Sequence, residues 1–178
     1  MSEKTLGLIN DNDAKWVDLR FTDPRGKEQH VTNSAKLIDD DFFEVGAMFD
    51  GSSIAGWKSI NDADMILMPD DSTAVIDPFT EETTVNLRCD IVEPSTLQGY
   101  DRDPRALAKR AEAYLATTGI GDTAYFGPEP EFFIFDSARF DYTANAGYHF
   151  IDSEEGIWNS GQEGANLAYR PRHKEGYF

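Results

Sequence analysis

The sequence predicts an α+β fold in which a small mixed domain precedes the start of a second domain. Apolar and polar residues alternate over 15–22 and 84–92, as in strands with one buried face. Helical patterns do not follow each strand in turn, so a parallel sheet built from βαβ units is not expected. The segment 93–103 carries Pro, Gly and polar residues, which is typical of a domain boundary. We therefore expect one domain at residues 1-98 and another at 104-178.

The composition excludes several classes of protein. The formal net charge is -17, from 33 acidic and 16 basic side chains. Phosphate contacts need clustered Lys and Arg, so neither nucleic acid nor an anionic membrane surface is an expected partner. Cys89 is the only cysteine, which rules out an internal disulfide and fits a reducing cytoplasm. No apolar run approaches the roughly 20 residues of a membrane span, and residues 1–15 are too polar for a signal peptide.

The first part of the chain predicts a helix, a hairpin and a second helix. A weak helical pattern covers residues 3–12. The segment 15–22 then places Val17, Leu19 and Phe21 on one strand face, and the turn sequence at 23–26 returns the chain as a second strand over 27–33. Asp39 or Asp40 is expected to cap a short helix that contains Phe42, Phe43 and Val45 and ends at Gly46.

The middle of the chain predicts further strands and one clear helix. An apolar run at 65–68 leads into an acidic turn at 69–72 and a strand at 73–76, and the strand 84–92 has one apolar face formed by Val85, Leu87, Cys89 and Ile91. Asp103 and Pro104 are suited to start the following helix, and Gly119 to end it. Its apolar stripe is formed by Leu107, Ala111, Tyr114 and Leu115.

The most informative stretch is 127–135, GPEPEFFIF. In a strand, Glu129 and Glu131 share one face, and both faces are otherwise largely apolar, so we expect a covered strand with two carboxylates at the mouth of a core. Their Cβ atoms would lie about 7 Å apart, a spacing that suits two Mg²⁺ or Mn²⁺ ions better than one. Two such ions could flank a phosphate. The alternative is a strand whose polar start merely contains two glutamates.

Two motifs resemble the bacterial type I glutamine synthetases. Residues 127–136, GPEPEFFIFD, are similar to the start of that family's catalytic domain. Residues 48–57, MFDGSSIAGW, form a second match, which Ile60-Asn61 and the segment 64–70 extend. The two matches occur in the family's order and at its spacing. The resemblance implies a β-grasp domain followed by an incomplete catalytic domain, an antiparallel sheet with helices, whose remaining elements would come after residue 178.

The resemblance also implies an activity. Members of the family phosphorylate the γ-carboxylate of glutamate with ATP and displace the phosphate with ammonia, using Mg²⁺ or Mn²⁺. By resemblance, Glu129 and Glu131 would each bind a different metal ion. Asp50, Ser52 and Ser53 would bind ammonium, with Asp50 drawing off its proton.

Several implied features concern the end of the chain and its assembly. Tyr177 matches a tyrosine near the family's ammonium pocket, and Lys174 a nearby lysine; the alternatives are an ordinary packing tyrosine and a solvated lysine. The loop that contains Asp50 would reach the active site of a neighbouring subunit in a homo-oligomer of twelve chains. Residues that bind ATP and glutamate would come mainly from later sequence, so the 178 residues alone are expected to be inactive.

The remaining polar residues predict no additional site. The aspartates at 62, 64, 70 and 71 are expected in turns and caps, and His30, His149 and His173 are too scattered for a metal site. Gly119 and Gly121 precede the key stretch without joining a strand to a helix, so no phosphate-binding glycine loop is expected. Ala63 and Glu175 depart from the family pattern without affecting a candidate catalytic residue. Two alternatives stay open: a ligase that glutamylates another amine, and a non-catalytic assembly module.

Overall fold

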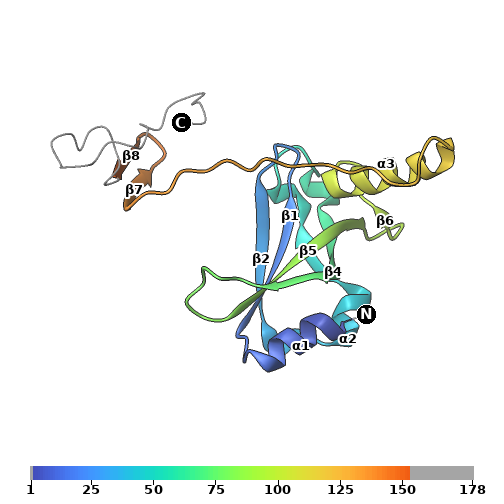
Figure 1. Cartoon of the computed structure of the whole chain (residues 1–178), viewed down its shortest axis with the longest axis horizontal. Helices are drawn as coiled ribbons and strands as arrows, with labels where there is room; N and C mark the ends of the chain where they lie inside the picture. Colours follow the sequence, from blue (N-terminus) through green and yellow to red (C-terminus); the bar gives the residue numbers. More distant parts are fainter. Residues whose placement is uncertain (1, 153–178) are drawn as a thin grey trace. The chain divides into compact units, whose positions relative to one another are not determined.

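The computed structural model describes residues 2–152 and divides the chain, between Ala124 and Tyr125, into two compact units (Figure 1). In the described part of the first unit, six strands form one sheet in the order β2-β1-β5-β4-β3, with β6 (Gln98–Gly99) paired to β5. β1 and β5 run parallel, and the other neighbours are antiparallel. In the described part of the second unit, β7 (Ser137–Tyr142) and β8 (Gly147–Asp152) form a separate hairpin.

The helices of the first unit lie at two ends of this sheet (Figure 1). α1 (Glu3–Asp11) and α2 (Asp40–Val45) contact β4, and α3 (Pro104–Thr118) contacts β5. Three short 3-10 turns complete the unit: η1 (Ala35–Leu37), η2 (Gly51–Ser53) and η3 (Ile60–Asp62). Because α3 contacts β5 of the sheet, it groups with the first unit, and the boundary expected at 98–104 stays a prediction.

The predicted hairpin is confirmed, with β1 (Trp16–Thr22) paired to β2 (Glu28–Ser34). The predicted cap of α2 is also confirmed, since the Asp39 side chain accepts a hydrogen bond from the Phe42 N–H. Gly46 follows this helix with φ +71°, and a Cβ there would lie 2.5 Å from Ile66 Cγ2. Glycine is therefore needed at this position both for its conformation and for its size.

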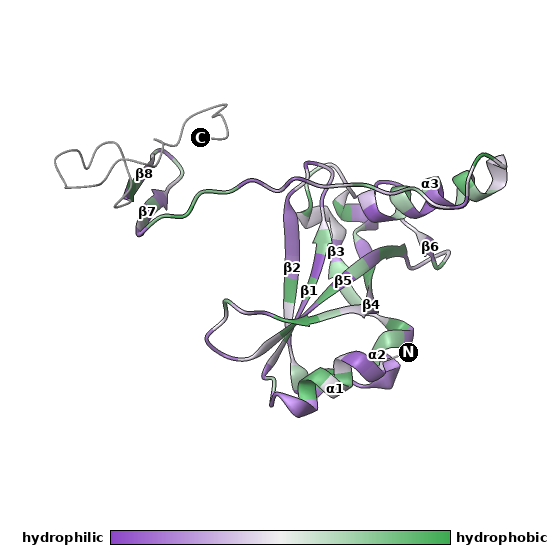
Figure 2. Cartoon of the chain, viewed as in Figure 1, coloured by the Kyte–Doolittle hydropathy of each residue, from purple (hydrophilic) through white to green (hydrophobic). Residues whose placement is uncertain are grey.

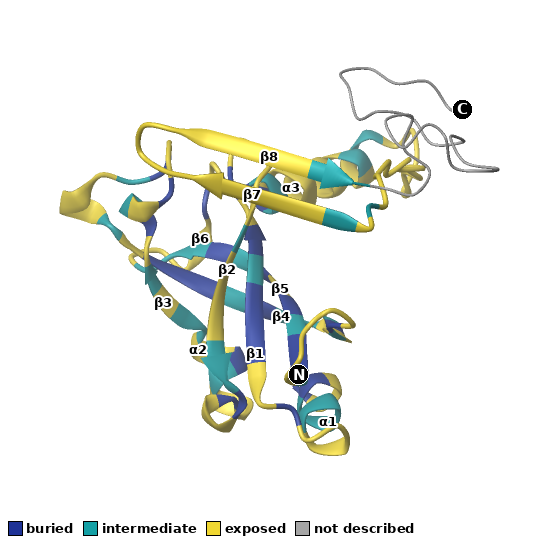
Figure 3. Cartoon of the chain, turned by 90° about the vertical axis from the view of Figure 1, so that its left-hand side faces the viewer, coloured by how far each residue is buried: buried dark blue, intermediate teal, exposed yellow. Residues whose placement is uncertain are grey.

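The core of the first unit is formed by apolar side chains of the central strands, and Figure 3 shows buried residues concentrated in β1, β4 and β5. The faces expected from the alternation in β1 and in β5 (Thr84–Glu93) are buried, and residues of β4 (Asp64–Ile76) join them. Figure 2 shows the same pattern as alternating polar and apolar bands along the strands, and α1 carries both kinds of surface. The most deeply buried side chains of this core are Val17, Leu19, Met65, Leu67, Val85, Leu87, Cys89 and Ile91.

One expectation for this unit was wrong in detail. The acidic turn expected at 69–72 does not break the strand, because β4 pairs with β5 on both sides and absorbs the extra residues as a register shift between Asp70 and Val75. The apolar stripe of α3 is largely exposed, with Leu107 at 58% and Tyr114 at 72%. Within the described residues, α3 contacts the sheet mainly near its first turn, where Asp103 caps it and Arg105 pairs with Asp70 and Asp90.

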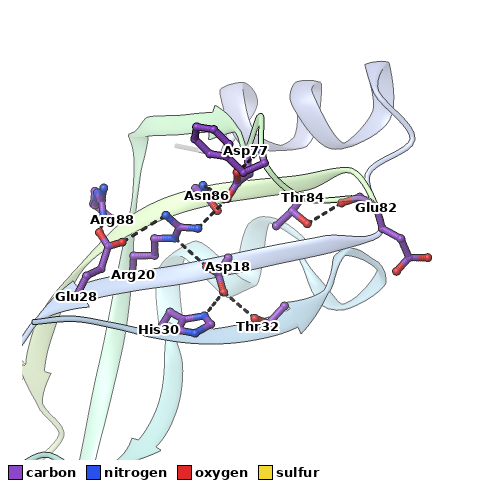
Figure 4. Close-up of polar contacts among 11 residues, drawn as sticks. Asp18, Arg20, Glu28, His30, Thr32, Asp77, Glu82, Thr84, Asn86 and Arg88 are labelled. Atoms are coloured by element: carbon purple, nitrogen blue, oxygen red, sulfur yellow. Dashed lines mark hydrogen bonds and ion pairs between the residues drawn. The ribbon is translucent and has the colours of Figure 1, made fainter. Parts of the chain in front are cut away.

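The opposite face of the sheet carries a polar network (Figure 4). The carboxylate of Asp18 is buried although the alternation places it on the solvent face of β1. It accepts hydrogen bonds from Arg20 Nε at 2.8 Å and Thr32 Oγ1 at 2.7 Å, and His30 Nδ1 lies 2.8 Å from it. Arg20 also donates to Asp77, which holds the loop after β4 against the sheet. Polar partners from two strands, β1 and β2, thus make the burial of Asp18 tolerable.

Candidate functional site

Asp50 lies at the end of β3 (Ala47–Asp50), opposite Asp64 at the start of β4. The chain leaves the sheet there, passes through η2 and η3, and returns at Asp64. We call residues 51–63 the Asp50 loop. The pairing of β3 with β4 therefore anchors the base of this loop on the sheet and leaves the Asp50 carboxylate at the edge of the unit.

The carboxylate of Asp50 is oriented by the residues that follow it. Its Oδ1 accepts hydrogen bonds from the Ser52 N–H at 2.8 Å and the Ser52 hydroxyl at 2.6 Å. These bonds, the hydroxyl's first, lower the pKa of Asp50, and the Ser53 N–H adds to the effect. Asp50 is exposed and anionic at neutral pH, which is the charge that attracts a small cation.

Gly51 sets the position of this turn. It is buried, its N–H donates to the Ala63 carbonyl at 2.7 Å, and a Cβ there would lie 2.5 Å from Met65 Sδ and 2.8 Å from Met65 Cγ. Because Met65 is fully buried in the core, any larger residue would push the turn away from the sheet. The sequence alone predicted a tight turn here, and the structure adds its close packing on β4.

An aromatic cluster supports the middle of the Asp50 loop. Trp57 is 5% exposed, and its ring lies 5.5 Å from Phe21, 6.1 Å from Phe49 and 5.5 Å from Tyr100, measured between ring centroids. Residues of β1, of β3 and of the connection between β6 and α3 thereby pack around one side chain of the loop. This packing explains a tryptophan at the end of the motif, at Trp57, without a direct chemical role.

The strand expected at 127–135 is absent in the second unit, and the expectation of a covered strand was wrong for this structure. The backbone has no regular secondary structure, and Phe132 and Ile134 are 79% and 82% exposed. A strand needs a neighbouring chain to satisfy its N–H and C=O groups, and within residues 2–152 no segment pairs with this one. Stacked rings of Phe133 and Phe135, with centroids 5.9 Å apart, are its main described packing contact.

Glu129 and Glu131 lie in this extended segment, both exposed. Carboxylate oxygens are the ligands that Mg²⁺ and Mn²⁺ prefer, so the pair fits a divalent ion in kind. The number of ligands is too small, however, because residues 2–152 bring together no group of three or more His, Cys, Asp or Glu side chains that could hold a metal. The two glutamates are therefore at most part of a metal site.

The other candidate residues fall into two groups. Asp71 accepts hydrogen bonds from the N–H groups of Lys4 and Thr5 at the start of α1, which is the capping role expected of it, whereas Asp62 forms an ion pair with Lys58. Tyr177 and Lys174, with His173 and Glu175, lie outside the described residues. In the part of the chain that the structure describes, no helix is long and apolar enough to cross a bilayer.

Two family descriptions match the chain, one after the other. The glutamine synthetase β-grasp domain matches residues 13–94, and the glutamine synthetase catalytic domain matches residues 101–178. The chain belongs to the glutamine synthetase family. Its fold is accordingly a β-grasp domain followed by part of the catalytic domain.

Individual glutamine synthetases agree with this assignment. The chain is 63% identical to that of Azotobacter vinelandii over 98% of its length, 62% identical to that of Pseudomonas aeruginosa over its whole length, and 59% identical to that of Escherichia coli K12 over 99%. It spans 38%, 39% and 38% of these relatives, respectively.

Solved structures support the fold. A cryo-electron microscopy structure of Plasmodium falciparum glutamine synthetase matches 88% of this chain and 30% of its own, with a TM-score of 0.63 and 22% identity. An ADP complex of GmaS matches 66% of this chain and 26% of its own, with a TM-score of 0.58 and 22% identity.

Sequence reasoning missed the residues that hold the Asp50 loop of this glutamine synthetase family member. Lys58 follows the motif directly, while Glu93 and Arg102 lie at the far end of β5 and beyond it. Only the fold brings them together, where Lys58 pairs with Glu93 and Arg102 donates to backbone carbonyls of the loop. No local pattern in the sequence signals such contacts.

Proposed function

We propose that the full-length gene product joins ammonia to the γ-carboxylate of L-glutamate, with ATP, to give glutamine, ADP and phosphate. One observation carries the proposal: the Asp50 carboxylate is held by Ser52 at the exposed start of a loop, in a chain 59–63% identical to glutamine synthetases. The 178 residues are about 38% of the length of those enzymes, so the activity is proposed for the whole protein.

In this proposal Asp50 binds ammonium and receives a proton from it. Its carboxylate is ionised at neutral pH because the hydrogen bonds from Ser52 lower its pKa. An ionised carboxylate attracts NH₄⁺ and can accept its proton as NH₃ attacks the activated substrate. Ser52 orients the carboxylate, and the neighbouring Ser53 hydroxyl can bind the ammonium. Tyr177 is proposed to complete the ammonium pocket.

Glu129 and Glu131 are proposed to supply oxygen ligands to two different Mg²⁺ or Mn²⁺ ions. When bound, such ions neutralise charge on the phosphate groups of ATP. The glutamates would fix the ions relative to the chain. Their remaining ligands, and the groups that bind ATP and glutamate, are expected outside residues 2–152.

The activity is tested on the full-length gene product with ATP, glutamate, ammonium and Mg²⁺, and glutamine is measured by chromatography. Asp50→Asn should lower kcat/KM for ammonium by about 100-fold or more, the usual contribution of a general base. Asp11→Asn, an exposed aspartate at the end of α1, is the matched control and should have wild-type activity. Equal activity of the two variants would refute the role of Asp50. A panel of primary amines tests whether ammonia is the preferred acceptor.

We further propose a cytoplasmic homo-oligomer of twelve chains in which the Asp50 loop completes the active site of a neighbouring subunit. The proposal predicts complementation. Subunits with Asp50→Asn and subunits with Glu129→Gln should each be inactive alone and should regain part of the activity when co-expressed. Absence of any recovery in a mixed oligomer, verified by mass spectrometry, would exclude a shared site. Light scattering gives the number of chains.

A further inference from the structure

The Asp50 loop is long, and its two ends meet on neighbouring strands. Ordering such a loop opposes its conformational entropy, so specific contacts must hold it. In the described residues, several of these contacts come from one place, residues 93–103, which connect β5 to α3. We call this stretch the junction. It begins with Glu93 and ends with Asp103, whose side chain caps α3 and also accepts from the Ile91 N–H.

Arg102 makes the first contact from the junction. Its Nη1 donates to the Gly56 carbonyl at 2.7 Å and to the Trp57 carbonyl at 3.3 Å. Gly56 has φ +86°, so the loop reverses direction at the point that the guanidinium holds. A charged donor strengthens hydrogen bonds of this kind. One side chain therefore fixes the turn in the backbone of the loop.

Lys58 makes the second contact. Here the side chain belongs to the loop and its partner, Glu93, belongs to the junction. Its Nζ lies 2.7 Å from Glu93 Oε1 and 2.8 Å from Asp62 Oδ2, and 5.6 Å from the centroid of the Tyr100 ring. The Lys58 side chain is only 11% exposed. The hydrogen bonds that the Lys58 ammonium donates to Asp62 and then to Glu93 raise the pKa of Lys58, which keeps the amine charged. Lys58 thus links the returning segment of the loop, through Asp62, to the end of β5, through Glu93.

Backbone hydrogen bonds and an aromatic contact hold the junction against β5 and the loop. The Tyr100 N–H donates to the Ile91 carbonyl at 2.8 Å, and the Asp103 N–H donates to the Tyr100 carbonyl at 3.1 Å. The Tyr100 ring also meets Trp57 edge to face. Because the junction is bonded to the sheet, its contacts with the loop can position the loop relative to the sheet.

We infer that Arg102 and Lys58 are positioning residues for ammonium binding. Both act on the loop that begins at Asp50, and neither touches the Asp50 carboxylate. The inference rests on the proposed function, because it concerns the affinity of the same carboxylate for ammonium. Without either contact, the loop spends more time in conformations that cannot bind. If only about one tenth of the molecules have a competent loop, the apparent affinity for ammonium falls about tenfold.

The test separates positioning from mere folding stability. In the full-length gene product, Arg102→Met and Lys58→Met should each raise KM for ammonium about tenfold, while KM for glutamate and KM for ATP stay within about twofold. A loss of folded protein would lower the active fraction, and hence kcat, without changing KM. Lys58→Arg retains the charge and both carboxylate partners and should restore KM. Lys109→Met, which removes the ion pair between half-exposed Lys109 of α3 and Asp90 of β5, is the control.

Hydrogen exchange gives a second readout that does not depend on catalysis. Amides of residues 54–62 should exchange faster in Arg102→Met and Lys58→Met than in the wild type, while those of β1 and β5 are unchanged. An unchanged KM for ammonium in both variants, or equal changes in all three KM values, overturns the inference. If the wild type makes no glutamine, the proposed function fails instead, and unchanged exchange in the loop then overturns the positioning role separately.

Discussion

Arg20→Met should destabilise the first unit by about 3 kcal/mol. The Arg20 guanidinium donates from Nε to Asp18 and from Nη2 to Asp77, each at 2.8 Å (Figure 4). Both carboxylate side chains are 6% exposed, whereas Arg20 itself is 24% exposed. At the low end of about 1.5 kcal/mol for a hydrogen bond to a charged group, two such bonds give about 3 kcal/mol. The third contact, to half-exposed Glu28, adds little.

Two features keep the loss of stability in Arg20→Met below about 5 kcal/mol, which is the upper end of the range for a broken buried ion pair. Asp18 keeps its hydrogen bond from Thr32 and its contact with His30. Asp77 keeps its bonds from Asn86 and from the Phe79 N–H. Neither carboxylate is therefore left without partners, although each loses its neutralising charge.

Urea unfolding of the chain, followed by tryptophan fluorescence, measures the effect, since Trp57 is buried in the core of this unit. Arg88→Met is the matched control: Arg88 lies beside Arg20 in the β1–β5 register and, among residues 2–152, its ion-pair partner is half-exposed Glu28. It should cost less than about 1 kcal/mol. If Arg20→Met cost no more than Arg88→Met, the buried network would have no special role in stability.

The network also predicts a pH dependence. Burial opposes ionisation of Asp18, but hydrogen bonds from Thr32, His30 and Arg20 outweigh it and lower the pKa of Asp18. The Asn86 hydrogen bond, the Phe79 N–H and Arg20 lower the pKa of Asp77. Groups with a depressed pKa stabilise the fold above their unfolded pKa, and this contribution is lost as pH falls through the folded value. The wild type should therefore lose more stability below about pH 4 than Arg20→Met does.

Three further predictions concern other buried or capping groups. Asp103→Ala should lower the free energy of unfolding by about 1–2 kcal/mol because it removes the cap of α3; Asp103→Asn, which keeps an acceptor, should lose less, and equal losses in urea unfolding would contradict the capping role. Burial raises the pKa of Cys89 to about 12, so an aromatic disulfide reagent should label it about 100-fold or more slowly in the native chain than in urea; rapid native labelling would show that this core opens. Ser52→Ala removes the main cause of the low pKa of Asp50, so the acid limb of kcat/KM for ammonium in the full-length gene product should move to higher pH, and an unmoved limb would mean that Asp50 does not set it.

Much of the first unit could be predicted from the sequence because its signals are local. Alternation over 15–22 and 84–92 identified the buried faces of β1 and β5, since successive side chains of a strand point to opposite sides. Asp39 and Asp103 were recognised as caps because a short acceptor before a helix binds its first N–H groups. The same locality explains the error in β4, where turn residues at 69–72 became a bulge once β5 paired on both sides.

The candidate site was only partly predictable. Asp50, Gly51 and Ser52 form a continuous motif, so their mutual arrangement follows from a few dihedral angles. The expected strand at 127–135 depended on partners that the described residues do not supply, and the segment is exposed. Arg102 and Lys58 were missed because their contacts join β5, the junction and the Asp50 loop.

The sequence by itself determined the strand faces, the caps, the turn at Asp50 and, through two motifs, the family. The tertiary structure decided that Asp18 is buried, that Gly51 packs on Met65, and that Arg102 and Glu93 hold the loop. The physical reason is the separation along the chain over which each effect acts. Periodicity and capping act between residues a few positions apart, whereas burial and ion pairing depend on which distant segments the sheet brings together.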